Sequence, residues 1–144
     1  MPSETIAIAS DHGAVELKVA LTGDLQRRGF SVLDLGTDGP DSVDYPDFAD
    51  ALATAIREGR ATRGVLLCGS GIGMSIAANR HREIRAALVH DHLAARLARQ
   101  HNDANVLVMA GRSIGMKVAK DCLAAFLDTE FQGGRHARRV AKMS

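Results

Sequence analysis

The hexapeptide Cys68-Gly69-Ser70-Gly71-Ile72-Gly73 places a thiol and a hydroxyl among alternating glycines. An apolar run at residues 64–67 precedes it, and an alanine-rich run at residues 75–79 follows it. This order predicts a buried strand, a glycine turn and a helix whose first backbone N–H groups are free. Such N–H groups suit an anion, and the positive end of the helix dipole favours the reactive thiolate form of Cys68. Because most free cysteines are small buried hydrophobic residues, position alone leaves both interpretations of Cys68 open.

A glycine-rich turn of this kind also serves as a phosphate or dinucleotide loop. The dinucleotide motif requires its third glycine where this chain has Met74, and the lysine of a P-loop is absent. Asp91 lies at a suitable distance for a ribose contact, but the chain is too short to add a conventional catalytic domain. A phosphatase-type use of Cys68 would need an arginine at position 74. An oxyanion hole made by the loop amides and the Ser70 hydroxyl, beside a thiolate base, fits the loop better.

Other side chains with suitable chemistry lie elsewhere in the chain. His101 is followed by Asn102, and a lone histidine of this kind is more often a solvated helix end. Asp11 and His12 follow an apolar run, and taken alone they are equally a loop or capping pair.

Basic residues near the C-terminus suggest a phosphate grip. Arg135 and Arg139 are four residues apart and would point the same way from a helix, although such a set is most often a solvated face. Arg112 follows an apolar run and is a further phosphate candidate. Cys122 lies on an apolar helical stripe with Ile114 and Val118, which predicts a core position.

Five apolar runs predict the strands that position these residues, at 5–10, 30–35, 64–68, 84–89 and 106–110. Helical periodicity follows each strand, for example Leu17, Leu21 and Leu25 at every fourth position. The alternation predicts an α/β fold, a single-domain doubly wound (Rossmann-like) five-stranded parallel sheet with helices on both faces. The domain spans residues 1–144, with a C-terminal helical tail from about residue 134. In such a sheet, functional residues gather at the carboxyl ends of the strands.

Composition narrows the class of protein. The chain has 144 residues, of which 46% are hydrophobic and 24% charged, and its net charge is +1. This balance gives no general attraction to nucleic acid or to anionic membranes, and two cysteines make no disulfide framework or zinc set. No apolar run is long enough to span a membrane, and the N-terminus lacks the features of a signal peptide. We therefore expect a cytoplasmic protein.

Several motifs together resemble one family. In order and spacing they are Asp11-His12-Gly13, Asp44-Tyr45-Pro46, the hexapeptide from Cys68, Ala77-Ala78-Asn79, residues 99–105 (RQHNDAN) and Gly133-Gly134-Arg135-His136. Over essentially its whole length the chain resembles the ribose-5-phosphate isomerase B family, which also includes galactose-6-phosphate isomerase subunits. A second branch of that family has glutamate at the position of Met74 and lacks the cysteine, so this chain resembles the cysteine branch. One departure is local, because the family usually has alanine before the glycine where this chain has Gly13 before Ala14.

The resemblance implies a role for each candidate residue. Cys68 would move a proton between C1 and C2 of the sugar, and His101 would open the furanose ring. The enediolate oxygen would be held by Ser70 and by the amides of Gly69, Gly71, Ile72 and Gly73. Substrate contacts would come from Asp11, His12, Tyr45, Asn102 and, around the phosphate, from Arg112, Arg135 and Arg139.

The function implied is interconversion of ribose 5-phosphate and ribulose 5-phosphate without a cofactor. The same chemistry on a tetrose 4-phosphate or on galactose or allose 6-phosphate is an alternative. A non-catalytic sugar-phosphate or nucleotide-binding module is another, although such a module has no need of a thiol base beside an anion hole. Because family members are dimers or tetramers, the resemblance also implies a homodimer or homotetramer whose active sites are shared between subunits.

Overall fold

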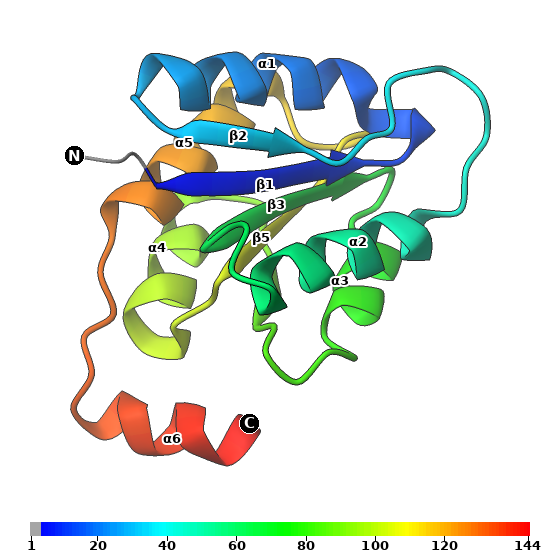
Figure 1. Cartoon of the computed structure of the whole chain (residues 1–144). Helices are drawn as coiled ribbons and strands as arrows, with labels where there is room; N and C mark the ends of the chain where they lie inside the picture. The colour runs from blue at the N-terminus through cyan, green and yellow to red at the C-terminus, as the bar shows by residue number, and fades with distance from the viewer. Residues whose placement is uncertain (1–3) are drawn as a thin grey trace.

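The computed structural model describes residues 4–144, and a five-stranded parallel sheet forms its centre (Figure 1). Its strands are β1 (Thr5–Ser10), β2 (Ser31–Asp34), β3 (Arg63–Cys68), β4 (Ala86–Leu88) and β5 (Val106–Ala110). They lie in the order β2-β1-β3-β5-β4, and each neighbouring pair is parallel. The predicted α/β class and doubly wound parallel sheet are confirmed. The first three residues of the predicted domain lie outside the described residues.

Helices connect the strands and cover both faces of the sheet (Figure 1). The helices are η1 (His12–Ala14), α1 (Val15–Arg27), α2 (Tyr45–Arg57), α3 (Ile72–Ala78), α4 (His92–Asn102), α5 (Met116–Asp128) and α6 (Arg135–Met143). One core joins the sheet to α1, α4 and α5, and the other joins it to α2 and α3. No helix of residues 4–144 has the length and apolar character needed to cross a membrane.

Strand residues alternate between these two cores. In β1, Ile6 and Ile8 face α1 and α5, whereas Ala7 faces α2. Period-two alternation normally gives one apolar and one polar face, but a parallel sheet covered on both sides needs apolar residues at every position. In β3 the same alternation puts Leu67 in the first core and Cys68 in the second, on the side of α2 and α3.

Some predicted faces differ in the structure. The last long helix, α5, begins at Met116, so the buried stripe contains Cys122 and Phe126 but not Val118, which is 39% exposed. In α4, Leu93 is 45% exposed and the helix packs through alanines. Alanines suit this position because they let α4 approach the sheet closely. The core position predicted for Cys122 is confirmed.

Candidate active site

A cleft of about 470 Å³ opens at the carboxyl ends of the central strands. The ends of β1, β3 and β5, together with α3 and the first turn of α2, line it with Asp11, Tyr45, Cys68, Gly69, Ser70, Ile72, Gly73, Ile76 and Arg112. Most of the residues singled out in the sequence are therefore brought together here. Parallel strands explain the grouping, because their carboxyl ends all reach the same edge of the sheet.

Cys68 is the last residue of β3 and is 4% exposed. Its carbonyl oxygen accepts a hydrogen bond from the Gly111 N–H at 2.7 Å, which fixes the backbone at the strand end. The N–H of Gly71 donates to its Sγ at 3.2 Å. The contact fixes the position of the sulfur at the start of the glycine loop, beside the loop amides.

Gly71 can point its N–H at the thiol because its φ is +77°, a left-handed conformation that favours glycine. A Cβ at this position would overlap the side chain of Leu88 and lie 3.2 Å from the carbonyl carbon of Met109. Both the conformation and the space therefore require glycine.

The backbone N–H groups of Gly69, Ser70 and Gly73 form a candidate anion-binding site. The Ile72 N–H donates to Ser70 Oγ at 3.2 Å. The N–H groups of Gly69, Ser70 and Gly73 make no hydrogen bond to residues 4–144. Ser70 is exposed, and its hydroxyl hydrogen remains to be donated. An oxyanion bound beside Cys68 would find these donors already in place.

Two side chains flank the loop. The Arg112 N–H donates to the Gly69 carbonyl at 3.0 Å, and a Cβ on Gly69 would lie 3.1 Å from Arg112 Nε. The guanidinium group of Arg112 therefore lies directly beside Gly69 of the glycine loop. On the other side the ring of Tyr45 lies against Gly73, where a Cβ would overlap its atoms. Because Gly69 and Gly73 have no side chain, the Arg112 guanidinium group and the Tyr45 ring can lie directly against the loop.

Asp11 and His12 lie at the end of β1. Asp11 Oδ1 accepts from the Gly13 N–H at 3.0 Å and so caps the short helix η1, while the same residue lines the cleft. His12 Nδ1 accepts from the Val43 N–H at 3.2 Å. Asp11 is therefore a helix-capping residue, as one of the two interpretations predicted, and it lines the cleft as well.

The other predicted residues lie at the opposite end of the sheet. His101 and Asn102 end α4, just before β5 begins, whereas Cys68 pairs with Ala110 at the far end of β5. The five residues of β5 alone separate these ends by about 13 Å, at about 3.3 Å per residue. Arg135 and Arg139 lie on α6, which packs on α4. One chain therefore does not bring the two sets together.

His101 instead stacks on His136, with ring centroids 4.3 Å apart and the rings inclined by 12°. Burial of the His136 ring and the nearby His101, Arg135 and Arg139 lower the pKa of His136. The stacked pair of rings lies where α6 packs against the end of α4.

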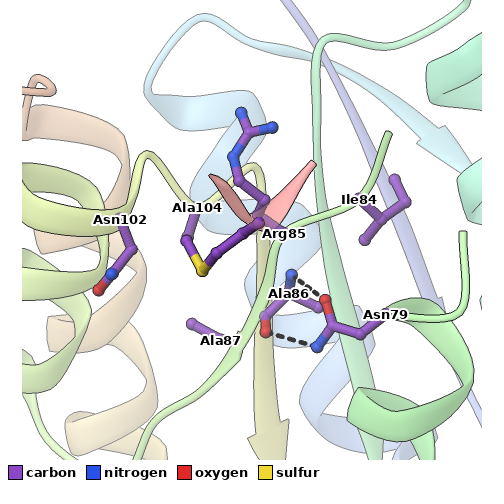
Figure 2. Close-up of a pocket in the computed structure, with 8 residues that line it drawn as sticks. Asn79, Ile84, Arg85, Ala86, Ala87, Asn102 and Ala104 are labelled. Atoms are coloured by element: carbon purple, nitrogen blue, oxygen red, sulfur yellow. Dashed lines mark hydrogen bonds between the residues drawn. The ribbon is translucent and has the colours of Figure 1, made fainter. Parts of the chain in front are cut away.

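Asn102 lines a second cleft, of about 410 Å³, beside the edge strand β4 (Figure 2). There Asn79 Nδ2 donates to the Ala86 carbonyl at 2.9 Å and its Oδ1 accepts from the Ala86 N–H at 2.8 Å. Its side chain thus occupies the free backbone edge of β4. Sequence reasoning did not single out this use of Asn79, nor Ile76 in the first cleft, although Ile76 lies one helical turn after Ile72. Within residues 4–144, no three His, Cys, Asp or Glu side chains are grouped to hold a metal ion.

Comparisons with known proteins identify the family of the chain. A family model described as Ribose/Galactose Isomerase matches residues 6–143. The ribose-5-phosphate isomerase B of Escherichia coli is 42% identical over 135 residues, covering 94% of this chain and 91% of the relative. The D-erythrulose-4-phosphate isomerase of Pectobacterium atrosepticum is 45% identical over 141 residues, covering 96% and 92%.

A crystal structure of a ribose 5-phosphate isomerase from Thermotoga maritima matches the fold with a TM-score of 0.95 at 52% identity, covering 97% of both chains. These relatives confirm the family indicated by the motifs. The chain is a sugar phosphate isomerase and belongs to the ribose/galactose isomerase family, together with the ribose-5-phosphate isomerases B.

Proposed function

We propose that the chain interconverts D-ribose 5-phosphate and D-ribulose 5-phosphate through an enediolate. The observation that carries the proposal is the thiol of Cys68 in an open cleft, beside the N–H groups of Gly69, Ser70 and Gly73, which have no acceptor among residues 4–144. The Cys68 thiolate would take the proton from C2 of the open-chain aldose, and the electron pair left there would form the C1–C2 double bond. The negative charge then develops on the C1 oxygen, which receives the proton of the C2 hydroxyl. The electron pair of the double bond takes the proton back from the thiol at C1 while the C2–O bond becomes the carbonyl of the ketose, and Cys68 is again a thiolate.

The surrounding residues would bind and orient the substrate. Ser70 and the free amides would hold the enediolate oxygen, as an oxyanion hole does. Asp11 and Tyr45 line the cleft and would contact the sugar, and Arg112 is the cation of that lining. His12 directly follows Asp11 and would also contact the sugar, although it is not among the residues that line the cleft. All of these groups come from a single chain.

We infer that a second copy of the chain completes each site, as a homodimer or homotetramer. The inference is supported by the distance of His101 from Cys68 within one chain, because both are needed if His101 opens the ring. Asn102 would position a sugar hydroxyl, and Arg135 and Arg139, exposed on α6, would bind the phosphate of the neighbouring site. We expect the enzyme to act in the cytoplasm and to require no cofactor.

Turnover of four-, five- and six-carbon aldose phosphates by wild type, Cys68→Ala and Cys122→Ala tests the chemistry. Loss of the base should reduce kcat about 10²- to 10⁴-fold, whereas the buried Cys122 serves as the matched control. NMR in deuterated water should show deuterium at the carbon that receives the proton, and none with Cys68→Ala. If wild type binds ribose 5-phosphate but turns over no sugar phosphate, the chain is a binding module and the proposal fails.

One alternative substrate is supported by a specific relative. Because a relative at 45% identity is named as a D-erythrulose-4-phosphate isomerase, a tetrose 4-phosphate is the second candidate. The ratio of kcat/KM for the tetrose and pentose phosphates decides between them, and a higher value for the hexose phosphates would exclude both.

Subunit sharing is tested by mixing two inactive variants, Cys68→Ala and His101→Ala. If sites are built from two chains, mixed oligomers contain a site with both residues intact and regain part of the activity. Subunit exchange is verified by mass spectrometry with one isotopically labelled partner. Proven exchange without any regained activity would refute the shared site.

A further inference from the structure

Lys18 is a buried cation outside the cleft, with 1% of its side chain exposed. It lies on α1, and its Nζ donates to both carboxylate oxygens of Asp34, at 2.6 and 2.8 Å, and to Asp38 Oδ1 at 2.8 Å. Burial alone would lower the pKa of Lys18, but the hydrogen bonds to the two aspartates outweigh it and the pKa is raised. The lysine is therefore a charged group held in place by two partners.

Both partners belong to the segment that leaves β2. Asp34 Oδ1 also accepts from the Gly36 N–H at 2.9 Å. The Gly36 carbonyl accepts from the Ser10 N–H at 2.7 Å, and the Ser10 carbonyl accepts from the Thr37 N–H at 2.8 Å. Lys18 thus fixes the start of the loop of residues 35–44 against the end of β1, next to Asp11.

The other end of this loop reaches His12. Val43 donates its N–H to His12 Nδ1, so the neutral ring must carry its proton on Nε2. In that form Nε2–H is a hydrogen-bond donor, which suits an anionic or hydroxyl oxygen of a sugar phosphate. Tyr45, two residues after Val43, lines the cleft itself.

We propose that Lys18 is a positioning residue for the active site. Through Asp34 and Asp38 it orders the 35–44 loop, and the loop in turn holds His12 as the Nε2–H donor through the Val43 N–H. The proposal rests on the proposed function in so far as His12 contacts the substrate. The tautomer of His12 can nevertheless be measured without any substrate.

Asp38→Ala is the sharpest perturbation. The Asp38 side chain is 84% exposed, so its removal cuts the direct bond between Lys18 and the loop, while Asp34 still pairs with the buried ammonium and still accepts from the Gly36 N–H. Asp41→Ala is the matched control, because Asp41 is an exposed carboxylate of the same loop with no bond to Lys18. Asp38→Asn should restore the wild-type behaviour, since its amide oxygen still accepts from Nζ.

Two measurements are compared across these variants. Asp38→Ala should raise KM for the preferred sugar phosphate about 10-fold with a smaller change in kcat, the size expected for one weakened hydrogen bond to a charged group. ¹⁵N NMR should show a single Nε2–H tautomer of His12 in wild type and a mixture in Asp38→Ala, with the signals assigned by a His12→Gln variant. Asp41→Ala should resemble wild type in both.

Wild-type KM and a wild-type His12 spectrum in Asp38→Ala would overturn the proposal, as would equal changes in Asp41→Ala. If wild type turns over no sugar phosphate, the proposed function fails, and the His12 spectrum alone then decides whether Lys18 positions the ring.

Discussion

Replacing Gly71 by alanine tests whether the turn beside Cys68 is fixed by conformation or by packing. A left-handed backbone costs an L-residue about 1–2 kcal/mol. The added Cβ would also overlap the Leu88 side chain and press on the Met109 backbone, which cannot rotate away. Overpacking of a buried site costs about 1–3 kcal/mol more. The sum predicts a loss of about 2–5 kcal/mol in the free energy of unfolding.

Gly59→Ala separates the two contributions. Gly59 has a φ of +78°, nearly that of Gly71, but nothing lies within 4 Å of its added Cβ. It should therefore lose only the conformational part, about 1–2 kcal/mol. Gly39→Ala, with open space and no positive φ, should change stability by less than about 0.5 kcal/mol.

Urea unfolding of all three variants at one fixed protein concentration measures these differences. At about 3 °C per kcal/mol for a chain of this size, the midpoint of thermal unfolding should fall by about 6–15 °C for Gly71→Ala and by about 3–6 °C for Gly59→Ala. Equal losses for Gly71→Ala and Gly59→Ala would refute the packing argument. If Gly39→Ala lowered the free energy of unfolding as much as Gly71→Ala, both the conformational and the packing arguments would be refuted.

Two further predictions concern titratable groups. A hydrogen bond from Arg63 lowers the pKa of Glu4 below its ordinary 4.5, although burial opposes the shift. A lowered carboxylate pKa contributes stability above the unfolded value, so wild type should exceed Glu4→Gln in urea unfolding at about pH 7 and lose that advantage on acidification to about pH 3; an advantage that grows on acidification would contradict this sign. Burial and two nearby aspartates raise the pKa of Cys122 to about 11. Iodoacetamide should therefore modify the native protein at Cys68, and peptide mass spectrometry showing label mainly on Cys122 would reverse the assignment.

Much of the fold follows from local patterns. Strand and helix periodicities with glycine stops between them predict five strands and their connecting helices, because each pattern depends on residues a few positions apart. The grouping of Asp11, Cys68 and Arg112 also follows, since parallel strands bring their carboxyl ends to one edge. The motifs from Cys68 and around His101 identify the family.

Contacts between residues far apart in the chain do not follow from local patterns. Lys18 directly follows Leu17 on α1, and nothing in the local pattern marks it as buried. It is buried because Asp34 and Asp38, 16 and 20 residues away, supply the compensating charge. The exposure of Val118 likewise depends on where α5 begins relative to the sheet.

The sequence by itself determined the α/β class, the glycine loop that follows Cys68 and the isomerase family, because these depend on residue type and local spacing. Only the tertiary structure decided that Gly71 turns its N–H to the thiol, that Lys18 ties the 35–44 loop to α1, and that His101 lies at the other end of the sheet from Cys68. The physical reason is that these relations arise from the packing of elements far apart in the chain, whereas periodicity reports only on near neighbours.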